Sequence, residues 1–279
     1  MNSAAPDIGS VTSKGGLNHC RMHFSVGLNG RRSYLKNAFC TPPFRVVDVT
    51  EDKKSPLTYL MTMSSSPGIL DRDVHDIRIT AEPGVRAVLQ NQSYQRLFQM
   101  NHGARLNMEM HLAEGSTFSY IQHPLVPHQN SIFRAVNKIF MAAGSELLLG
   151  EIITCGRKLS GEVFRFSHLQ SLTEIFIGGK IALKDNIVIV PAEIELNGIG
   201  QMEGFTHQAT LYYINLKSED CAHAASLVNE ILGAEDDLEY GVSKTLNRGL
   251  VARVLAYGGE QILDAFRKIE NEIIVKSKN

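Results

Sequence analysis

Three charged residues, each directly after a glycine, stand close together in the segment 150–166. They are Glu151, Arg157 and Glu162, and they follow Gly150, Gly156 and Gly161. Because glycine tolerates positive φ and close backbone approach, each glycine predicts a bend at which the next side chain can be aimed freely. The pattern therefore predicts two carboxylates and one guanidinium near one another. The alternative is a surface hairpin with solvated charges and one ion pair of little energetic value.

The four cysteines are scattered and form no CxxC pair, which is typical of a chain kept reduced in the cytoplasm. Cys155 is the one thiol whose neighbours, Gly156-Arg157, are of a kind that lowers a thiol pKa. A nucleophilic cysteine also needs a base, and the sequence places none beside it.

The histidines raise the question of a metal, because imidazole suits nickel, zinc and copper. His123 and His128 form the tightest pair, but the prolines between them favour an extended segment whose histidines face different ways. Met61, Met63, Met108 and Met110 have the spacing of strand residues that fill gaps in a core. We therefore predict no tight metal site.

The composition excludes several classes of function. The formal net charge is −1, Trp is absent, and no basic tract is interleaved with aromatic residues, so a nucleic-acid platform is not expected. No apolar run is long enough to span a bilayer. The chain carries no P-loop, dinucleotide fingerprint, HExxH or Gly-x-Ser-x-Gly motif, so no enzyme class is indicated. Residues 1–16 are small and polar, and they predict a flexible tail without the features of a signal peptide.

The elements that would position these residues are mostly strands. Residues 20–28 alternate apolar and polar, and Asn29-Gly30 predicts a hairpin after them. A second alternating strand is expected at 106–112. The remaining strands are predicted at 74–80, 85–90, 117–122, 132–140, 146–153, 163–169, 172–177 and 187–190.

Three similar turns separate pairs of these strands. Their glycines, Gly84, Gly115 and Gly144, lie 31 and then 29 residues apart. A near-fixed period indicates stacked units whose faces bury one another. We therefore predict that residues 17–212 form a mainly β, layered body, either a sandwich or a β-helix-like stack.

The composition changes near residue 213. Residues 219–232 and 260–276 have the apolar spacing of amphipathic helices, and 240–246 and 250–257 are predicted as paired strands. This predicts a small α+β portion at 213–279. No linker separates it from the body, so we expect one domain over 17–279.

Two further segments carry polar groups. Residues 64–73 form an acidic turn whose simplest interpretation is a loop with Asx-type hydrogen bonds. The polar stretch 91–96, which begins Asn91-Gln92-Ser93, directly follows an apolar strand, a position at which side chains satisfy backbone groups or line a wet cavity.

Taken together, these segments resemble the UreD/UreH family of urease accessory proteins. The matching pieces occur in order at 41–44, 66–73, 92–96, 123–127 and 150–164. The resemblance covers about residues 17–215 well and the C-terminal third loosely. One departure is Arg72, which stands where many relatives have glycine and adds positive charge beside Asp73.

The resemblance implies a β-rich protein with two helices that is not an enzyme. It implies a scaffold that joins apo-urease to the accessory protein UreF and, through UreF, to the GTPase UreG, and it allows a dimer of that complex. It also implies a water-filled passage for Ni²⁺ in transit, with no tightly bound cofactor. The residues assigned to this passage are Asp73, Ser93, Glu151 and Glu162, with Gln92 and Arg157 in support.

Such a passage must bind its ion weakly enough to release it, which carboxylates, hydroxyls and waters do better than cages of histidine and cysteine. Two other functions stay open. One is an assembly chaperone for apo-urease with no metal-conducting role. The other is a hydrolase on a β scaffold that uses Cys155 or a carboxylate pair.

Overall fold

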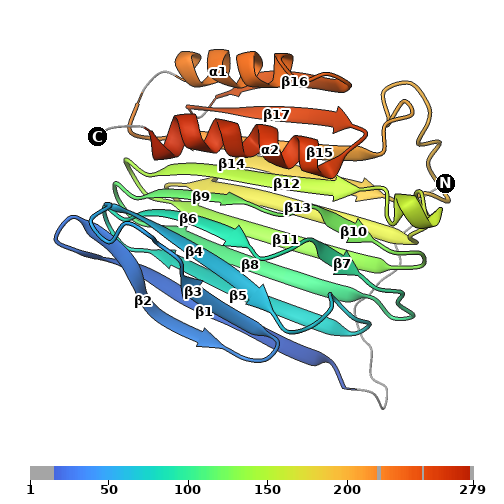
Figure 1. The fold of residues 1–279 in the computed structure, drawn as a ribbon, viewed down its shortest axis with the longest axis horizontal. Helices are drawn as coiled ribbons and strands as arrows, with labels where there is room; N and C mark the ends of the chain where they lie inside the picture. The colour runs from blue at the N-terminus through green and yellow to red at the C-terminus, as the bar shows by residue number, and fades with distance from the viewer. Residues whose placement is uncertain (1–15, 219–220, 247, 277–279) are drawn as a thin grey trace.

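The computed structural model describes residues 16–218, 221–246 and 248–276, and it consists of two β-sheets with two helices at one side (Figure 1). The flexible tail predicted for 1–16 therefore falls almost entirely outside the described residues. Most elements of the described residues are strands, which confirms the prediction of a mainly β fold.

Sheet A has seven strands in the order β14-β13-β11-β8-β5-β1-β2. Their bounds are β1 (Asn18–Asn29), β2 (Arg32–Cys40), β5 (Asp73–Ala81), β8 (Ala104–Leu112), β11 (Ile132–Met141), β13 (His168–Ile177) and β14 (Lys180–Ile189).

Sheet B has ten strands, eight of them in the order β16-β17-β15-β12-β9-β6-β4-β3, with β7 and β10 paired beside β12. Their bounds are β3 (Phe44–Asp48), β4 (Leu57–Ser64), β6 (Arg86–Asn91), β7 (Gln95–Leu97), β9 (Thr117–Ile121), β10 (Leu125–Pro127), β12 (Glu146–Thr154), β15 (His207–Asn215), β16 (Leu238–Thr245) and β17 (Gly249–Ala256).

The chain winds alternately between the two sheets. It runs from β5 in sheet A to β6 in sheet B, back to β8, on to β9, back to β11 and on to β12. Successive passes pair in parallel, both for β5, β8 and β11 in sheet A and for β6, β9 and β12 in sheet B. The β-helix-like prediction is therefore confirmed for the centre of the body.

The three glycine turns are the corners at which the chain passes from sheet A to sheet B. Gly84, Gly115 and Gly144 have φ of 70°, 69° and 63°, a region that favours glycine. The Gly84 amide donates to the Glu114 carbonyl at 2.9 Å, and the Gly115 amide donates to the Ala143 carbonyl at 3.2 Å. The corners stack on one another, which explains the repeat in the sequence.

The two sheets enclose the main hydrophobic core, which contains fully buried residues such as Leu60, Leu89, Met110 and Leu147. Strands alternate their side chains between faces, so the neighbouring residues of sheet B point the other way. Those outward residues, Val88 and Leu148 among them, form a second core with the helices.

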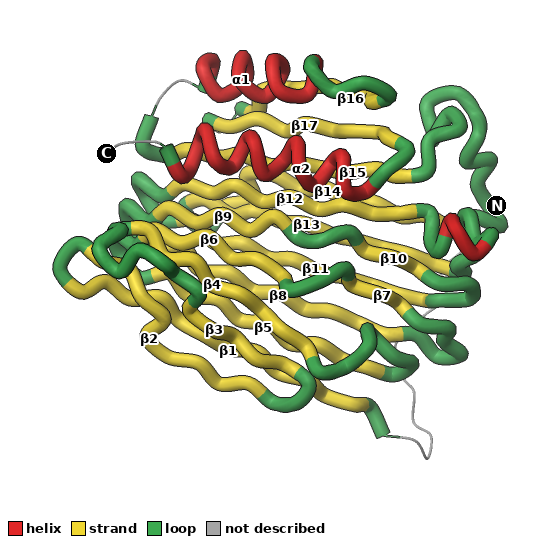
Figure 2. Tube along the Cα trace, viewed as in Figure 1, coloured by secondary structure: helices red, strands yellow, loops and turns green. Residues whose placement is uncertain are grey.

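The helices α1 (Ala222–Gly233) and α2 (Gly259–Glu270) cover the outer face of sheet B, as Figure 2 shows. A short π-helix, Asn271–Val275, continues α2. Both predicted helices are confirmed, although α1 begins three residues later than the prediction and its first predicted residues fall outside the described part. The paired strands β16 and β17 are confirmed and extend sheet B.

The N-terminal hairpin is confirmed with a shift of one residue. Asn29 pairs with Arg32, so the turn consists of Gly30 and Arg31, with Gly30 at φ 62°. Among the described helices, none is long and apolar enough to cross a membrane.

One strand prediction was wrong. Residues 163–167 form no strand, and 168–169 are the start of β13, which contains the predicted strand 172–177 and so confirms it. The chain before it contains a 3₁₀ turn, Lys158–Ser160, and left-handed backbone at Gly161 and Phe164. Phe166 is buried in a separate core cluster at this end, so its apolar character reflects packing of a loop.

Candidate functional site

A row of polar side chains crosses sheet B on the face that looks toward sheet A. The row has four members on four neighbouring parallel strands. They are Thr62 on β4, Asn91 on β6, Gln122 directly after β9, and Glu151 on β12. Thr62 pairs with Asn91, Leu89 pairs with Tyr120, and Ile121 pairs with Gly150. These registers place the four residues side by side. We call them the polar row.

The direction of the polar row follows from strand alternation. Each member stands two residues after a side chain of the main core, namely Leu60, Leu89, Tyr120 and Leu149. Residues i and i+2 of a strand share a face, so the row also points between the sheets. The side-chain amide of Asn91 donates from Nδ2 to the Thr62 hydroxyl at 3.0 Å and to the Tyr120 hydroxyl at 3.1 Å.

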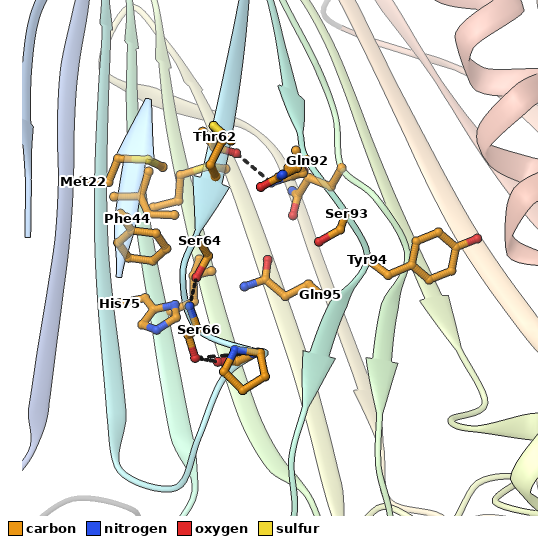
Figure 3. A pocket seen from close by; sticks show the side chains of 18 of the residues that line it. Met22, Phe44, Thr62, Ser64, Ser66, His75, Gln92, Ser93, Tyr94 and Gln95 are labelled. Atoms are coloured by element: carbon orange, nitrogen blue, oxygen red, sulfur yellow. Dashed lines mark hydrogen bonds between the residues drawn. The ribbon is translucent and has the colours of Figure 1, made fainter. Parts of the chain in front are cut away.

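Two cavities lie along the polar row. The first has a volume of about 80 Å³ and is lined by Thr62, Asn91 and Gln122 of the row, together with the loops around Ser66 and Ser93. Figure 3 shows Gln92, Ser93 and Gln95 on one side of it and Ser64, Ser66 and His75 on the other. A space of this size holds a few water molecules.

The second cavity has a volume of about 40 Å³ and contains Glu151 in its lining. It shares Gln95, Leu106 and Gln122 with the first cavity, so the two are neighbours. Together they run between the sheets from the loops that follow β4 and β6 to β12.

Glu151 is 8% exposed, and its carboxylate accepts three hydrogen bonds from sheet A. Ser171 donates at 2.8 Å, Asn137 at 3.0 Å and Thr173 at 3.1 Å. Burial raises the pKa of Glu151, and these hydrogen bonds oppose the shift without cancelling it. Glu151 is therefore a buried carboxylate whose charged form is disfavoured by its burial.

Asp73 lies at the start of β5, 4% exposed, and is not among the residues that line the two cavities. Its Oδ1 accepts a hydrogen bond from the Asn18 side chain and its Oδ2 accepts one from the Leu70 amide, both at 2.8 Å. The Nε2 atom of His75 is 3.6 Å from the Asp73 Oδ2 atom.

Gln92 and Ser93 lie in the loop between β6 and β7, and both are exposed and line the first cavity. The Gln92 amide donates to the Thr62 carbonyl at 2.9 Å, which holds the loop against β4. These two residues therefore stand at the mouth of the first cavity.

Glu162 and Arg157 lie outside the two cavities, in the loop that follows β12. The exposed Arg157 guanidinium makes two hydrogen bonds to the Glu162 carboxylate, one of them from Nε at 2.9 Å. The Gln129 amide also donates to Glu162, at 3.1 Å. The structure thus brings Arg157 to Glu162 and places Glu151 elsewhere, inside the body.

The prediction of three glycine bends was wrong at Gly150. Gly150 lies inside the buried strand β12 and has no positive φ, whereas Gly156 and Gly161 have φ of 117° and 79°. A Cβ on Gly150 would lie 3.1 Å from Phe266 and 3.3 Å from Ile121. This glycine therefore allows α2 to approach the sheet closely.

The suggestion that neighbouring residues lower the pKa of Cys155 was also wrong. Cys155 is fully buried, and burial raises the pKa of its thiol because desolvation outweighs the attraction of Lys158. His123 and His128 have separate surroundings, as expected. His123 packs edge-on against Tyr94, and His128 packs against Phe98.

Sequence reasoning missed His75 and two members of the polar row, Thr62 and Gln122, whereas Asn91 begins the polar stretch 91–96 that was predicted to satisfy backbone groups or line a wet cavity. An alignment of successive windings of the chain would have found the row. Its members Thr62, Asn91, Gln122 and Glu151 are 29, 31 and 29 residues apart, which is close to the spacing of the glycine turns. Within the described residues, no three His, Cys, Asp or Glu side chains are grouped closely enough to hold a metal ion.

The fold and the site define a class of protein: a β-helix-like body with a row of polar side chains between its sheets and helices on one outer face. Comparison with known proteins narrows this class. The model of the UreD urease accessory protein family matches residues 18–274. The chain therefore belongs to the UreD family of urease accessory proteins.

Individual relatives agree with this assignment. The chain is 51% identical over 253 residues to the urease accessory protein UreD of Flavobacterium johnsoniae, and the match covers 91% of each chain. It is 35% identical over 245 residues to the UreD of Actinobacillus pleuropneumoniae, covering 85% of this chain and 90% of the relative. It is 29% identical over 255 residues to that of Acetivibrio thermocellus, covering 90% and 95%.

Proposed function

We propose that this protein acts in urease maturation in the cytoplasm, as a scaffold that joins apo-urease to UreF-like and UreG-like accessory proteins. We further propose that Ni²⁺ passes along the polar row toward the urease active site. Membership of the UreD family supports the first part. The geometry between the sheets supports the second.

The observation that carries the proposed passage is that the two cavities are neighbours along the polar row. Gln95, Leu106 and Gln122 line both, so an ion that reaches Gln122 has polar groups on either side of it. Amide and hydroxyl oxygens coordinate a divalent ion loosely and leave room for its waters. Ligands of this kind favour transfer over storage.

Glu151 is suited to draw the ion inward. Its carboxylate lies in the second cavity, where burial disfavours its charged form. A nearby cation favours that charged form, so the ion and the carboxylate stabilise each other. The hydrogen bonds from Ser171, Asn137 and Thr173 fix the carboxylate in place without a second charge.

The register suggests where the path continues. Glu151 pairs with Thr210 on β15, and Thr210 pairs with Arg253 on β17. Arg253 forms an ion pair of 2.7 Å with Asp185 on β14, where both sheets approach their edges. Under this proposal the Asp185–Arg253 pair lies at the far end of the path.

The test is to co-produce urease with its accessory proteins and variants of this chain. With Glu151→Gln, the complexes should assemble normally, while the purified urease should contain less nickel and show less activity. Glu109→Gln is the matched control, because Glu109 is a partly exposed carboxylate on the outer face of sheet A.

Asp73→Ala, Ser93→Ala and Glu162→Ala test the other residues assigned to the passage. Full nickel loading in a variant would remove that residue from the path, and full loading in all four variants would overturn the passage. Weaker assembly of the complexes, with normal loading of those that form, would favour the alternative of an assembly chaperone with no metal-conducting role.

A further inference from the structure

His75 is a buried imidazole that the fold leaves without a hydrogen bond. It points inward from β5, is 2% exposed and lines the first cavity. Neither of its ring nitrogens has a hydrogen-bond partner among the described residues. Buried polar groups are nearly always paired, so an unpaired imidazole beside a cavity indicates that something in the cavity pairs with it.

Asp73 stands where the carboxylate partner of a metal-binding histidine usually stands. Its Oδ2 is 3.6 Å from His75 Nε2, slightly beyond hydrogen-bond distance. Metal-binding histidines typically direct one ring nitrogen to a carboxylate or carbonyl and bind the ion with the other. Here that arrangement leaves Nδ1 for a ligand. The two hydrogen bonds that Asp73 accepts, from Asn18 and Leu70, hold its carboxylate in place.

The other groups around the first cavity indicate the class of ion. Met22, Met63 and Met108 line it together with Ser64 and Ser66. Imidazole and thioether ligands suit late transition metals, whereas Ca²⁺ and Mg²⁺ prefer oxygen ligands alone.

We propose that His75 is the ligand of a transit site in the first cavity, where its Nδ1 binds a divalent transition-metal ion and Asp73 orients the ring through Nε2. The identification of this ion as Ni²⁺ rests on the proposed function. One imidazole completed by water binds weakly enough to release the ion toward Gln122. Asp73 is then a positioning residue rather than part of the lining.

The experiment measures binding of Ni²⁺ alone to the full chain, purified with its UreF-like partner if solubility requires it. Equilibrium dialysis at low metal concentration should show one site that His75→Gln weakens at least about tenfold, the loss expected when a metal ligand or its orienting partner is removed. Asp73→Asn should weaken the same site by a smaller factor. His111→Gln, a half-exposed histidine on the outer face of sheet A, should leave it unchanged.

X-ray absorption at the nickel edge gives a second readout, one that reports the kind of ligand and not the affinity. The wild-type spectrum should contain the scattering of an imidazole ring, and the His75→Gln spectrum should lack it. The inference is overturned if the wild type shows no imidazole scattering, or if His75→Gln binds Ni²⁺ as tightly as the wild type. A His75→Leu variant with a normal melting temperature separates loss of the ligand from loss of the fold.

This outcome can be told apart from a failure of the proposed function. If Ni²⁺ binds at His75 but all passage variants load urease fully, the site exists and the passage does not. If His75→Gln binds Ni²⁺ normally while Glu151→Gln impairs loading, the passage stands and the transit site is absent.

Discussion

The Glu151 carboxylate on β12 accepts a hydrogen bond from the Ser171 hydroxyl on β13, at 2.8 Å, and this bond joins sheet B to sheet A through the interior of the protein. Asn137 and Thr173 donate to the same carboxylate from the same side. A residue of the proposed passage is therefore also a structural tie between the two sheets.

Replacement of Glu151 by alanine should destabilise the protein. The change leaves the three donors of sheet A without their acceptor, and an unpaired buried polar group costs about 1–3 kcal/mol. Glu151→Gln keeps an acceptor oxygen and should cost less. Urea denaturation of both variants, with Glu109→Ala at a partly exposed position as control, checks this order. Equal midpoints for Glu151→Ala and the wild type would contradict the role of a tie.

Gly150→Ala should weaken the docking of α2 on sheet B. The new Cβ would lie 3.1 Å from Phe266, a fully buried ring of α2, and overpacking of this kind costs about 1–3 kcal/mol. Gly241→Ala is the control, because a Cβ at that strand position meets nothing within 4 Å. Denaturation midpoints that fall equally for both variants would show that close packing is not the cause.

Glu270 should make stability depend on pH. It is 6% exposed at the end of α2, next to the Ser119 hydroxyl, and burial raises the pKa of Glu270 to about 7, with Ser119 and Arg267 opposing the shift. Between about pH 4.5 and 7 the folded protein therefore holds a proton that the unfolded chain releases. The free energy of unfolding should fall as the pH rises through this window, by about 3 kcal/mol at most.

Glu270→Gln removes the titrating group while keeping an acceptor for Ser119. Its stability should lose this slope and exceed that of the wild type above the window. Urea denaturation within the window and on either side of it measures the effect, with Glu272→Gln, a change at a partly exposed glutamate of the same C-terminal segment, as control. A Glu270→Gln variant with the wild-type slope would assign the pH dependence to other groups.

The chain should be poorly soluble without its UreF-like partner. Several large apolar side chains are exposed, among them Phe39 and Ile181 at 55% each. Exposed apolar surface is typical of proteins that work within complexes. Size-exclusion chromatography with and without the partner checks this expectation. A monodisperse monomer at high concentration, in the absence of the partner, would contradict it.

The sequence was sufficient to predict the layered fold because its signals are local. The alternation of strand residues and the recurrence of Gly84, Gly115 and Gly144 each need only a short window. Helix α2 was predicted for the same reason. The apolar residues around Phe166 misled the prediction, because a loop folded onto a core carries the composition of a strand.

The candidate site was harder to predict because it depends on register between distant strands. Gln122 belongs to the polar row only because the strand register places it beside Asn91 and Glu151, which are 31 and 29 residues away in the sequence. Conversely, Glu151 and Glu162 are close in sequence, yet one is buried between the sheets and the other pairs with Arg157 at the surface. His75 could not be singled out, since the lack of a partner is a property of the folded interior.

The stacked glycine corners set how far an ion would have to travel. Each winding of the chain adds one strand to each sheet and one side chain to the polar row, so its length grows by one strand spacing, about 4.8 Å, per winding. An insertion of a few residues at a corner would leave the route unchanged. An insertion of a whole winding, about 30 residues as judged from the glycine spacing, would lengthen it by one step.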